Sequence, residues 1–189
     1  MGFSDLMRYG KYGLHTLFSS VLFFYRHLSL LILALIPSCI RAYQMWNQLQ
    51  VPIVFEILVE LTRIVLFLLM LCLMTTGNLT SLWRKRFWQR LGDSCTLHLK
   101  KNWPCFFLAQ IVIFLVFLYG LGNLAIIVIV NLSLTPILDI LDINSVEHSA
   151  QSAYNAYLFF LKNMSVIPLA MVYILIMLGV GPTNNKKLD

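Results

Sequence analysis

The chain has 189 residues, of which 59% are hydrophobic and only 12% are charged. Soluble domains carry about 25% charged residues, so this composition argues strongly against a water-soluble fold. The net charge is +6, but the basic residues lie beside apolar runs. Anionic lipid headgroups are therefore a better partner for them than nucleic acid, for which the sequence shows no recognition module.

The first predicted element is an amphipathic helix over residues 3–27. Apolar side chains recur there every three or four positions, and the opposite side carries Arg8, Lys11 and His15. This arrangement is typical of a helix that lies in the membrane interface rather than crossing it.

Two apolar runs follow, at 28–46 and 53–76, and each is long enough to cross the hydrocarbon layer. Arg41 lies near the end of the first run, close to Tyr43 and Trp46. We expect this arginine to extend to the far interface, where the two aromatic side chains suit the headgroup level.

A second interfacial helix is expected over residues 80–101. It carries six cations, which are Arg84, Lys85, Arg86, Arg90, Lys100 and Lys101. Apolar side chains spaced by four, from Trp83 to Leu99, form its other face. Because Lys and Arg concentrate in cytoplasmic loops, we expect this helix on the cytoplasmic side with its cations on anionic headgroups. The same pattern can also dock a partner helix.

The third apolar run, from 104 to 138, is too long for one straight crossing. At 1.5 Å per residue its 35 residues extend about 52 Å, against about 30 Å of hydrocarbon. Gly120–Asn123 is the obvious place for a turn, which would give two short crossings at 104–119 and 124–141. One long tilted helix is the alternative.

A third interfacial helix is expected over 144–163, and a last crossing over 164–181. Each of the three amphipathic stretches ends in a basic or polar pair followed by an apolar run with an early proline, and this repetition favours five crossings. The sequence thus predicts an all-α polytopic membrane helical bundle. Residues 1–189 form one integral membrane domain with about five transmembrane helices (four in the alternative) and a cytoplasmic N-terminus.

Glu56, Glu60 and Arg63 form an intramembrane polar stripe, because spacings of four and three place them on one side of the second crossing. A charge at the centre of a crossing costs at least about 2.5–3.5 kcal/mol, so it normally faces a partner or water. The stripe is either an ion or substrate pathway or a Glu60–Arg63 pair that fixes helix register. We favour the pair, because the other crossings offer no clear acidic partners.

Residues for catalysis or metal binding are not evident. The four histidines and the four cysteines show no metal-ligand spacing, and no serine lies in a GxSxG sequence. We therefore expect no catalytic residue, no cofactor and no metal site, and we do not expect an enzyme.

A family resemblance rests on Pro136, the acidic turn 139–142, Glu147–Ala150 and Lys162-Asn163 before the last crossing. In these features the C-terminal half resembles small, largely uncharacterised bacterial multi-pass membrane proteins. Those proteins are related to the membrane domain joined to some glycerophosphodiester phosphodiesterases. The resemblance implies a bacterial inner-membrane architecture and no particular reaction.

Three functions remain open from the sequence. The first is a structural or interaction protein of the membrane, with anionic lipids, another membrane protein or a second copy as partner. The second is a small transporter or channel subunit that uses Glu56, Glu60 and Arg63. The third is a lipid-modifying membrane enzyme. We favour the first.

Overall fold

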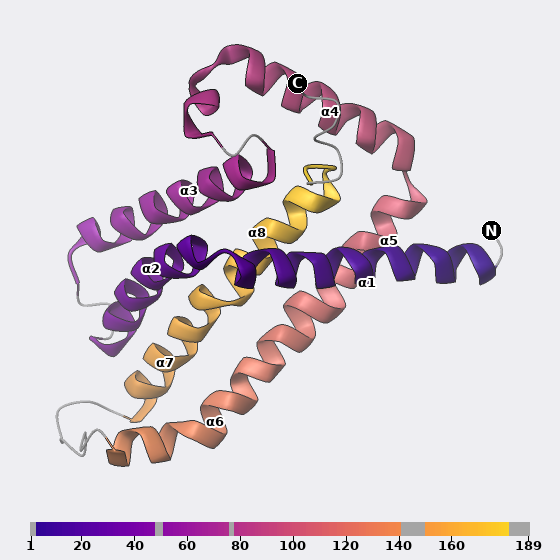
Figure 1. Ribbon diagram of the computed structural model, residues 1–189. Helices are drawn as coiled ribbons and strands as arrows, with labels where there is room; N and C mark the ends of the chain where they lie inside the picture. The colour runs from indigo at the N-terminus through magenta and orange to yellow at the C-terminus, as the bar shows by residue number, and fades with distance from the viewer. Residues whose placement is uncertain (1–2, 48–50, 76–77, 141–149, 182–189) are drawn as a thin grey trace.

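The computed structural model describes residues 3–47, 51–75, 78–140 and 150–181, and all the regular secondary structure over these residues is helical (Figure 1). In chain order the helices are α1 (Phe3–Arg26), α2 (Leu28–Trp46), α3 (Ile53–Thr75), the 3₁₀ helix η1 (Leu79–Trp83), α4 (Lys85–Asn102), α5 (Cys105–Ile113), the π-helical segment η2 (Phe114–Leu121), α6 (Gly122–Ile140), α7 (Ala150–Met164) and α8 (Val166–Met177). Four stretches of the described chain are helical, long and apolar enough to cross a membrane: Leu28–Trp46, Ile53–Thr75, Cys105–Leu138 and Ala150–Met177. The fold is a helical membrane bundle.

The expected turn at Gly120–Asn123 is wrong. α5, η2 and α6 form one continuous helix, and Gly122 has the right-handed helical angles φ −61° and ψ −47°. A reversed backbone in hydrocarbon would leave N–H and C=O groups without partners, whereas a helix satisfies them internally. Gly122 faces α8, where a Cβ would lie 3.4 Å from Cγ2 of Val166, an ordinary van der Waals contact. Because the turn is absent, the arrangement with five crossings is wrong as well.

The third expected interfacial helix is also placed differently. α7 begins at Ala150, and only Ser165 separates it from α8, so the two form one candidate crossing of 28 residues. α7 makes its most extensive contacts with α2 and buries Ala153 and Ala156. Small side chains let two backbones approach closely, which drives helix packing in a bilayer. Residues 141–149, which hold part of the acidic turn and the start of that expected helix, lie outside the described residues.

The two ends of the bundle differ in what they carry. At the end formed by α4, Tyr9 and Tyr12 of α1 make edge contacts with Phe106 at the start of α5, and His98 of α4 lies against Gly179 after α8. We call this the α4 end. The opposite end carries the end of α2, the start of α3, the end of α6 and the start of α7 (Figure 1). The first and last described helices therefore reach the same end, as an even number of crossings requires.

The middle of α1 packs through a narrow stripe of small residues and leaves an apolar side exposed. Gly13, Thr16 and Ser20 are buried, and the two hydroxyls donate to backbone oxygens four residues earlier, at 3.1 and 2.7 Å. A Cβ at Gly13 would lie 2.7 Å from Cγ1 of Ile113, so α1 crosses α5 in close contact. The exposed side includes Leu14, Phe18, Leu22 and Tyr25. An exposed apolar side beside Lys11 and His15 suits a helix at the membrane surface.

The main core lies toward the α4 end, where α1, α2, α3 and α8 meet. Its fully buried side chains include Phe24, Leu30, Met70, Met74 and Tyr173. A second cluster joins α6 to the α7–α8 helix through Ile126, Val130, Leu158 and Val166. The polar residues of α3 lie outside both clusters.

α8 ends in a Schellman motif, in which Val180 N–H donates to Leu175 O and Gly179 N–H donates to Ile176 O, each at 2.9 Å. Gly179 has φ +87°, and a Cβ there would lie 2.6 Å from Cγ of His98. The glycine is needed both for the left-handed backbone and for the close approach of α4.

We expect Gly179→Ala to lower the free energy of unfolding by about 1–2 kcal/mol from the backbone alone, with the His98 contact adding to the loss. Thermal unfolding in detergent measures this effect. Gly92→Ala is the matched control, because Gly92 lies within α4 with nothing near its Cβ position. That change should stabilise the helix by about 0.5–1 kcal/mol. Equal effects of the two substitutions would contradict this account of the α8 end.

Candidate functional site: an ionic network and a cationic helix

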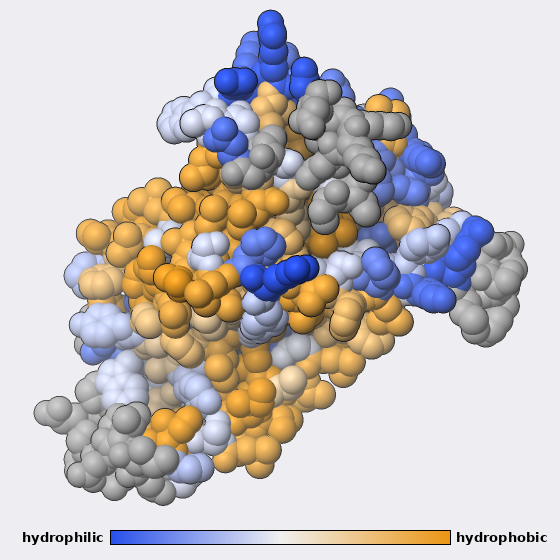
Figure 2. Space-filling view, in the orientation of Figure 1, coloured by the Kyte–Doolittle hydropathy of each residue, from blue (hydrophilic) through white to orange (hydrophobic). Residues whose placement is uncertain are grey.

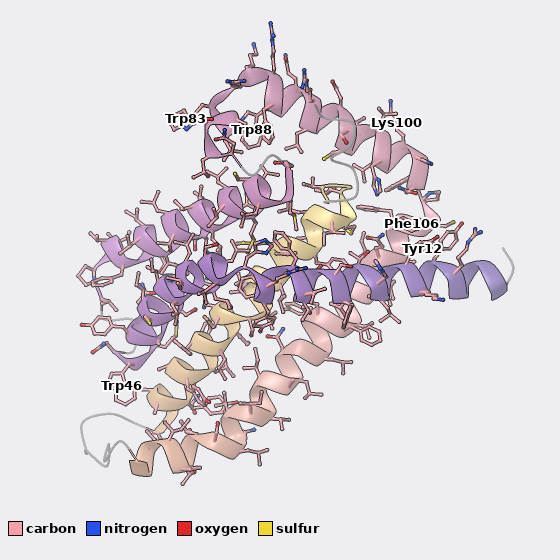
Figure 3. The ribbon with its side chains drawn as sticks, viewed as in Figure 1. Tyr12, Trp46, Trp83, Trp88, Lys100 and Phe106 are labelled. Atoms are coloured by element: carbon pink, nitrogen blue, oxygen red, sulfur yellow. The ribbon has the colours of Figure 1, made fainter. Side chains whose placement is uncertain are left out.

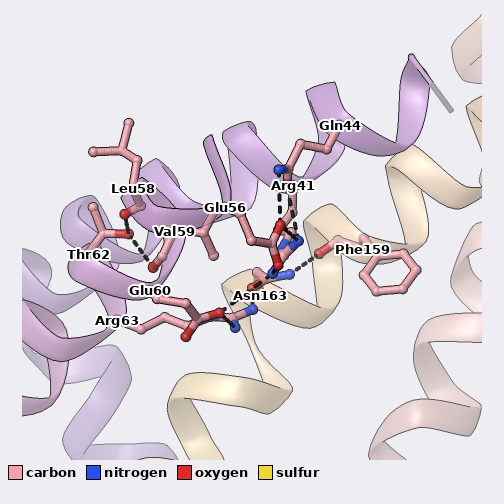
Figure 4. A network of polar contacts seen from close by, with 10 residues as sticks. All are labelled: Arg41, Gln44, Glu56, Leu58, Val59, Glu60, Thr62, Arg63, Phe159 and Asn163. Carbon is pink, nitrogen blue, oxygen red and sulfur yellow. Dashed lines mark hydrogen bonds and ion pairs between the residues drawn. The ribbon is translucent and has the colours of Figure 1, made fainter. Parts of the chain in front are cut away.

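The polar stripe of α3 forms part of an ionic network that begins on α2. Arg41 donates to Glu56 with both terminal nitrogens, Nη1 to Oε2 and Nη2 to Oε1, each at 2.7 Å (Figure 4). Gln44, one turn further along α2, donates to the same Oε2 at 3.2 Å and accepts from Arg41 at 3.0 Å. A two-bond arginine–carboxylate pair with a supporting amide is a strong and directional contact.

The network continues along α3 and reaches α7. Arg63 donates from Nη1 to Oε1 of Glu60 at 2.7 Å, and the same oxygen lies 3.5 Å from Arg41. The other terminal nitrogen of Arg63 donates to Oδ1 of Asn163 at 2.6 Å, and Asn163 donates to the carbonyl of Phe159 at 2.8 Å. One set of contacts thus joins three candidate crossings.

Burial within the network is uneven. The side chains of Arg41 and Arg63 are 13% and 20% exposed, whereas those of Glu56 and Glu60 are 50% and 54% exposed. The arginines lie inside the bundle and the carboxylates lie at its surface. Two cations and two anions cancel, which is how charges inside a membrane are normally accommodated. Nε of Arg63 is buried without a hydrogen-bond partner.

Sequence reasoning grouped Glu56, Glu60 and Arg63 but missed Arg41 and Asn163. Arg41 was expected at the far interface, and the structure instead turns it to Glu56. A signal was present, because Arg41 and Glu56 lie at comparable distances on either side of the α2–α3 connection, and antiparallel neighbours at such positions face each other. Asn163 gave no such signal, since it is uncharged and 100 positions from Arg63.

The other candidate site is the outer side of α4. All six of its predicted lipid-contact residues (Arg84, Lys85, Arg86, Arg90, Lys100 and Lys101) are exposed. The opposite side of α4 packs on the main core through Phe87, Leu91 and Cys95. Figure 2 shows the resulting hydrophilic cap above an apolar body. The helix therefore packs its apolar side on the bundle and exposes its cations at the surface.

The cations of α4 gather near its two ends, each beside an exposed tryptophan. Trp83 (Figure 3), 92% exposed, comes directly before the first cations, and Trp103, 64% exposed, follows the last. The sequence placed Trp83 on one apolar face with Phe87, Leu91 and Cys95, but only the last three pack on the core, and Trp83 in η1 is exposed. The ring nitrogen of Trp88, in α4, donates to the carbonyl of Leu82 in η1 at 2.7 Å.

Two titratable groups lie on the packed side of α4. Burial raises the pKa of the Cys95 thiol above its usual 9.0, so the thiol stays protonated near neutral pH. Burial, with the nearby Lys101 charge, lowers the pKa of His98 below 6.5, so the imidazole is neutral near pH 7. Neither group changes the charge of α4 at that pH.

Metal chemistry has no support in the described part of the chain, where no group of three His, Cys, Asp or Glu side chains is close enough to hold an ion. Comparison with protein-family models, with curated proteins and with solved structures finds no match. The resemblance to bacterial multi-pass proteins therefore stays a prediction, and function has to be argued from the two sites.

Proposed function

We propose that the protein is a structural and lipid-interaction protein of a bacterial inner membrane, and that α4 binds anionic headgroups at the cytoplasmic surface. The observation that supports this proposal is the division of α4 into a packed apolar side and an exposed cationic side with a tryptophan at each end. Aromatic side chains favour the headgroup level, and each nearby Lys or Arg adds about 1 kcal/mol of attraction to an anionic surface.

The distribution of charge supports a cytoplasmic α4 end. Besides the cations of α4, Lys11 lies on the exposed side of α1 near this end. Near the opposite end, Arg41 is neutralised by Glu56. Excess positive charge at one end of a bundle favours that end in the cytoplasm.

The transporter alternative has weaker support. The charges of Arg41, Glu56, Glu60 and Arg63 pair with one another, as a register-fixing contact would require. The buried side chains of α3 between Arg63 and the α4 end are apolar, including Leu66, Met70 and Met74. A pathway for ions needs polar groups or water along its length, and the network provides them over only part of the span.

Single-tryptophan variants of the full chain test the headgroup contact. One variant keeps only Trp83 and a second keeps only Trp46 at the opposite end, with the remaining tryptophans changed to phenylalanine. In mixed nanodiscs, brominated phosphatidylglycerol should quench Trp83 more strongly than brominated phosphatidylcholine at the same mole fraction. Salt should reduce that difference, because exposed charges are screened. Trp46 should show no preference.

Changing Arg84, Lys85 and Arg86 together to glutamine should remove the preference at Trp83. Lys162→Gln is the matched control, since Lys162 lies on α7 over the Phe159 ring, 5.7 Å from its centre, and away from α4. Equal quenching of Trp83 by the two lipids in the unmodified helix would contradict the proposed function.

A further inference from the structure

A pocket of about 190 Å³ opens between α2, α6 and α7 near the end opposite α4. α2 contributes Ala42 and Trp46, α6 contributes Leu134 and Ile137, and α7 contributes Ala153 and Phe160. Trp46 lies at the end of α2, far from α4 (Figure 3). None of these residues belongs to the ionic network or to the cationic side of α4.

The pocket exists because α2 and α6 each pack on α7 but hardly on each other. Alanines occupy positions on both α2 and α7 where larger side chains would fill the space between the helices. Val130, one turn before Leu134 on α6, belongs with Leu158 of α7 to the second core cluster. The result is a hollow with three helical walls rather than a flat apolar surface.

The chemistry of the lining favours an apolar occupant. Tyr157 and Trp46 are the lining side chains with a polar group, and the Tyr157 hydroxyl shares a hydrogen bond with Oγ of Ser133 at 3.1 Å. A buried water needs two to four polar partners, and an apolar cavity of about 150 Å³ stays dry and binds a hydrocarbon such as benzene. This pocket is somewhat larger, is open on one side, and has an almost entirely apolar lining.

We infer that the pocket holds a segment of one acyl chain of a membrane phospholipid. All three of its walls belong to candidate membrane crossings, so lipid chains are the hydrocarbon that surrounds it. Trp46 at the end of its span places the pocket just inside the headgroup level. The volume fits a short run of methylene groups, whereas a packed helix would need a groove about 10 Å wide.

The variant that keeps only Trp46 provides the test, in nanodiscs that contain phosphatidylcholine brominated near the headgroup end of one chain. A bound chain stays in contact with Trp46, so quenching should reach half its maximum at a lower mole fraction than for the Trp83-only variant. Ala153→Phe fills the pocket and should at least halve the quenching of Trp46. Phe160→Ala enlarges the pocket and should not weaken the quenching of Trp46. Phosphatidylcholine has no net charge, so the result does not depend on α4.

Ala125→Phe is the matched control, because Ala125 lies on the exposed side of α6 away from the pocket. It should leave quenching of Trp46 unchanged. If Ala153→Phe does not fold, Ile137→Phe fills the pocket from its α6 wall. Equal mole-fraction dependence for Trp46 and Trp83, or no effect of a folded filling variant, would overturn the inference. Quenching that appears only when the protein is diluted in lipid would show that a second copy occupies the pocket, which also overturns it.

Discussion

Arg41→Leu should lower the melting temperature of the purified protein more than any other single substitution in the ionic network. Arg41 makes both direct bonds to Glu56, also faces Glu60, and orients Gln44. Its removal leaves a carboxylate beside an apolar helix with only an amide as partner. Thermal unfolding in detergent, followed by circular dichroism, measures the loss.

The Glu60–Arg63 pair allows a double-mutant cycle. Breaking a fully buried pair by removing one partner costs about 3–5 kcal/mol. Because the Glu60 side chain is 54% exposed, we expect Glu60→Leu and Arg63→Leu to cost less, about 1–3 kcal/mol each, between the values for an exposed and a fully buried pair. The double change leaves Arg41 and Glu56 balanced, so it should recover much of the loss.

Thr62→Val is the control for this cycle. Thr62 lies between the two paired residues, and its hydroxyl bonds only to the backbone of its own helix, at Leu58 and Val59. Thr62→Val should therefore change the free energy of unfolding very little. If the single changes at Glu60 and Arg63 destabilise the protein as little as Thr62→Val does, both charges reach water. The network then does not fix the register of the helices.

The parts of the fold that could be predicted from sequence are those with strong local periodicity. The expected helices at 3–27, 28–46 and 53–76 match α1, α2 and α3 to within a residue. The basic helix at 80–101 corresponds to η1 and α4 with a short break at Arg84. Apolar length and spacing decide these elements, and both are local properties.

The glycines between the apolar runs could not be interpreted from sequence alone, because glycine favours turns and also allows helices to pack closely. Gly120 and Gly122 could have formed a turn, but a turn in hydrocarbon needs polar groups to satisfy its backbone. Asn123 is the one polar side chain there, and it donates to Tyr119 O at 2.6 Å within the same helix. Gly122 instead faces Val166 of α8, and this contact, distant in the sequence, could not be inferred locally.

The repeated pattern of aromatic, basic and apolar residues was misleading in its third copy. Lys162-Asn163 was expected at a membrane surface, yet Asn163 is buried and binds Arg63. The pocket was equally hidden, because it results from how α2 and α6 diverge on α7. Sequence patterns predicted the helices well and their mutual contacts poorly.

Cysteine labelling should show Asn123 to be inaccessible from both sides of the membrane. The test uses a background in which Cys39, Cys72, Cys95 and Cys105 are replaced, with Asn123→Cys, Asn47→Cys or Gln89→Cys added singly. In intact cells with a permeabilised outer membrane, an impermeant maleimide should label only position 47, at the end opposite α4. Disrupting the inner membrane should expose position 89 on α4.

Position 123 lies close to the midpoint of the helix Cys105–Leu138, so neither treatment should label it. That helix extends about 51 Å at 1.5 Å per residue, and a span longer than the hydrocarbon layer is accommodated by tilting or kinking. The π-helical segment next to Asn123 supplies a local irregularity of this type. Labelling of position 123 from outside would restore the turn at Gly120–Asn123 and five crossings. It would also separate the two chain ends across the membrane, contrary to the contact between Gly179 and His98 at the α4 end.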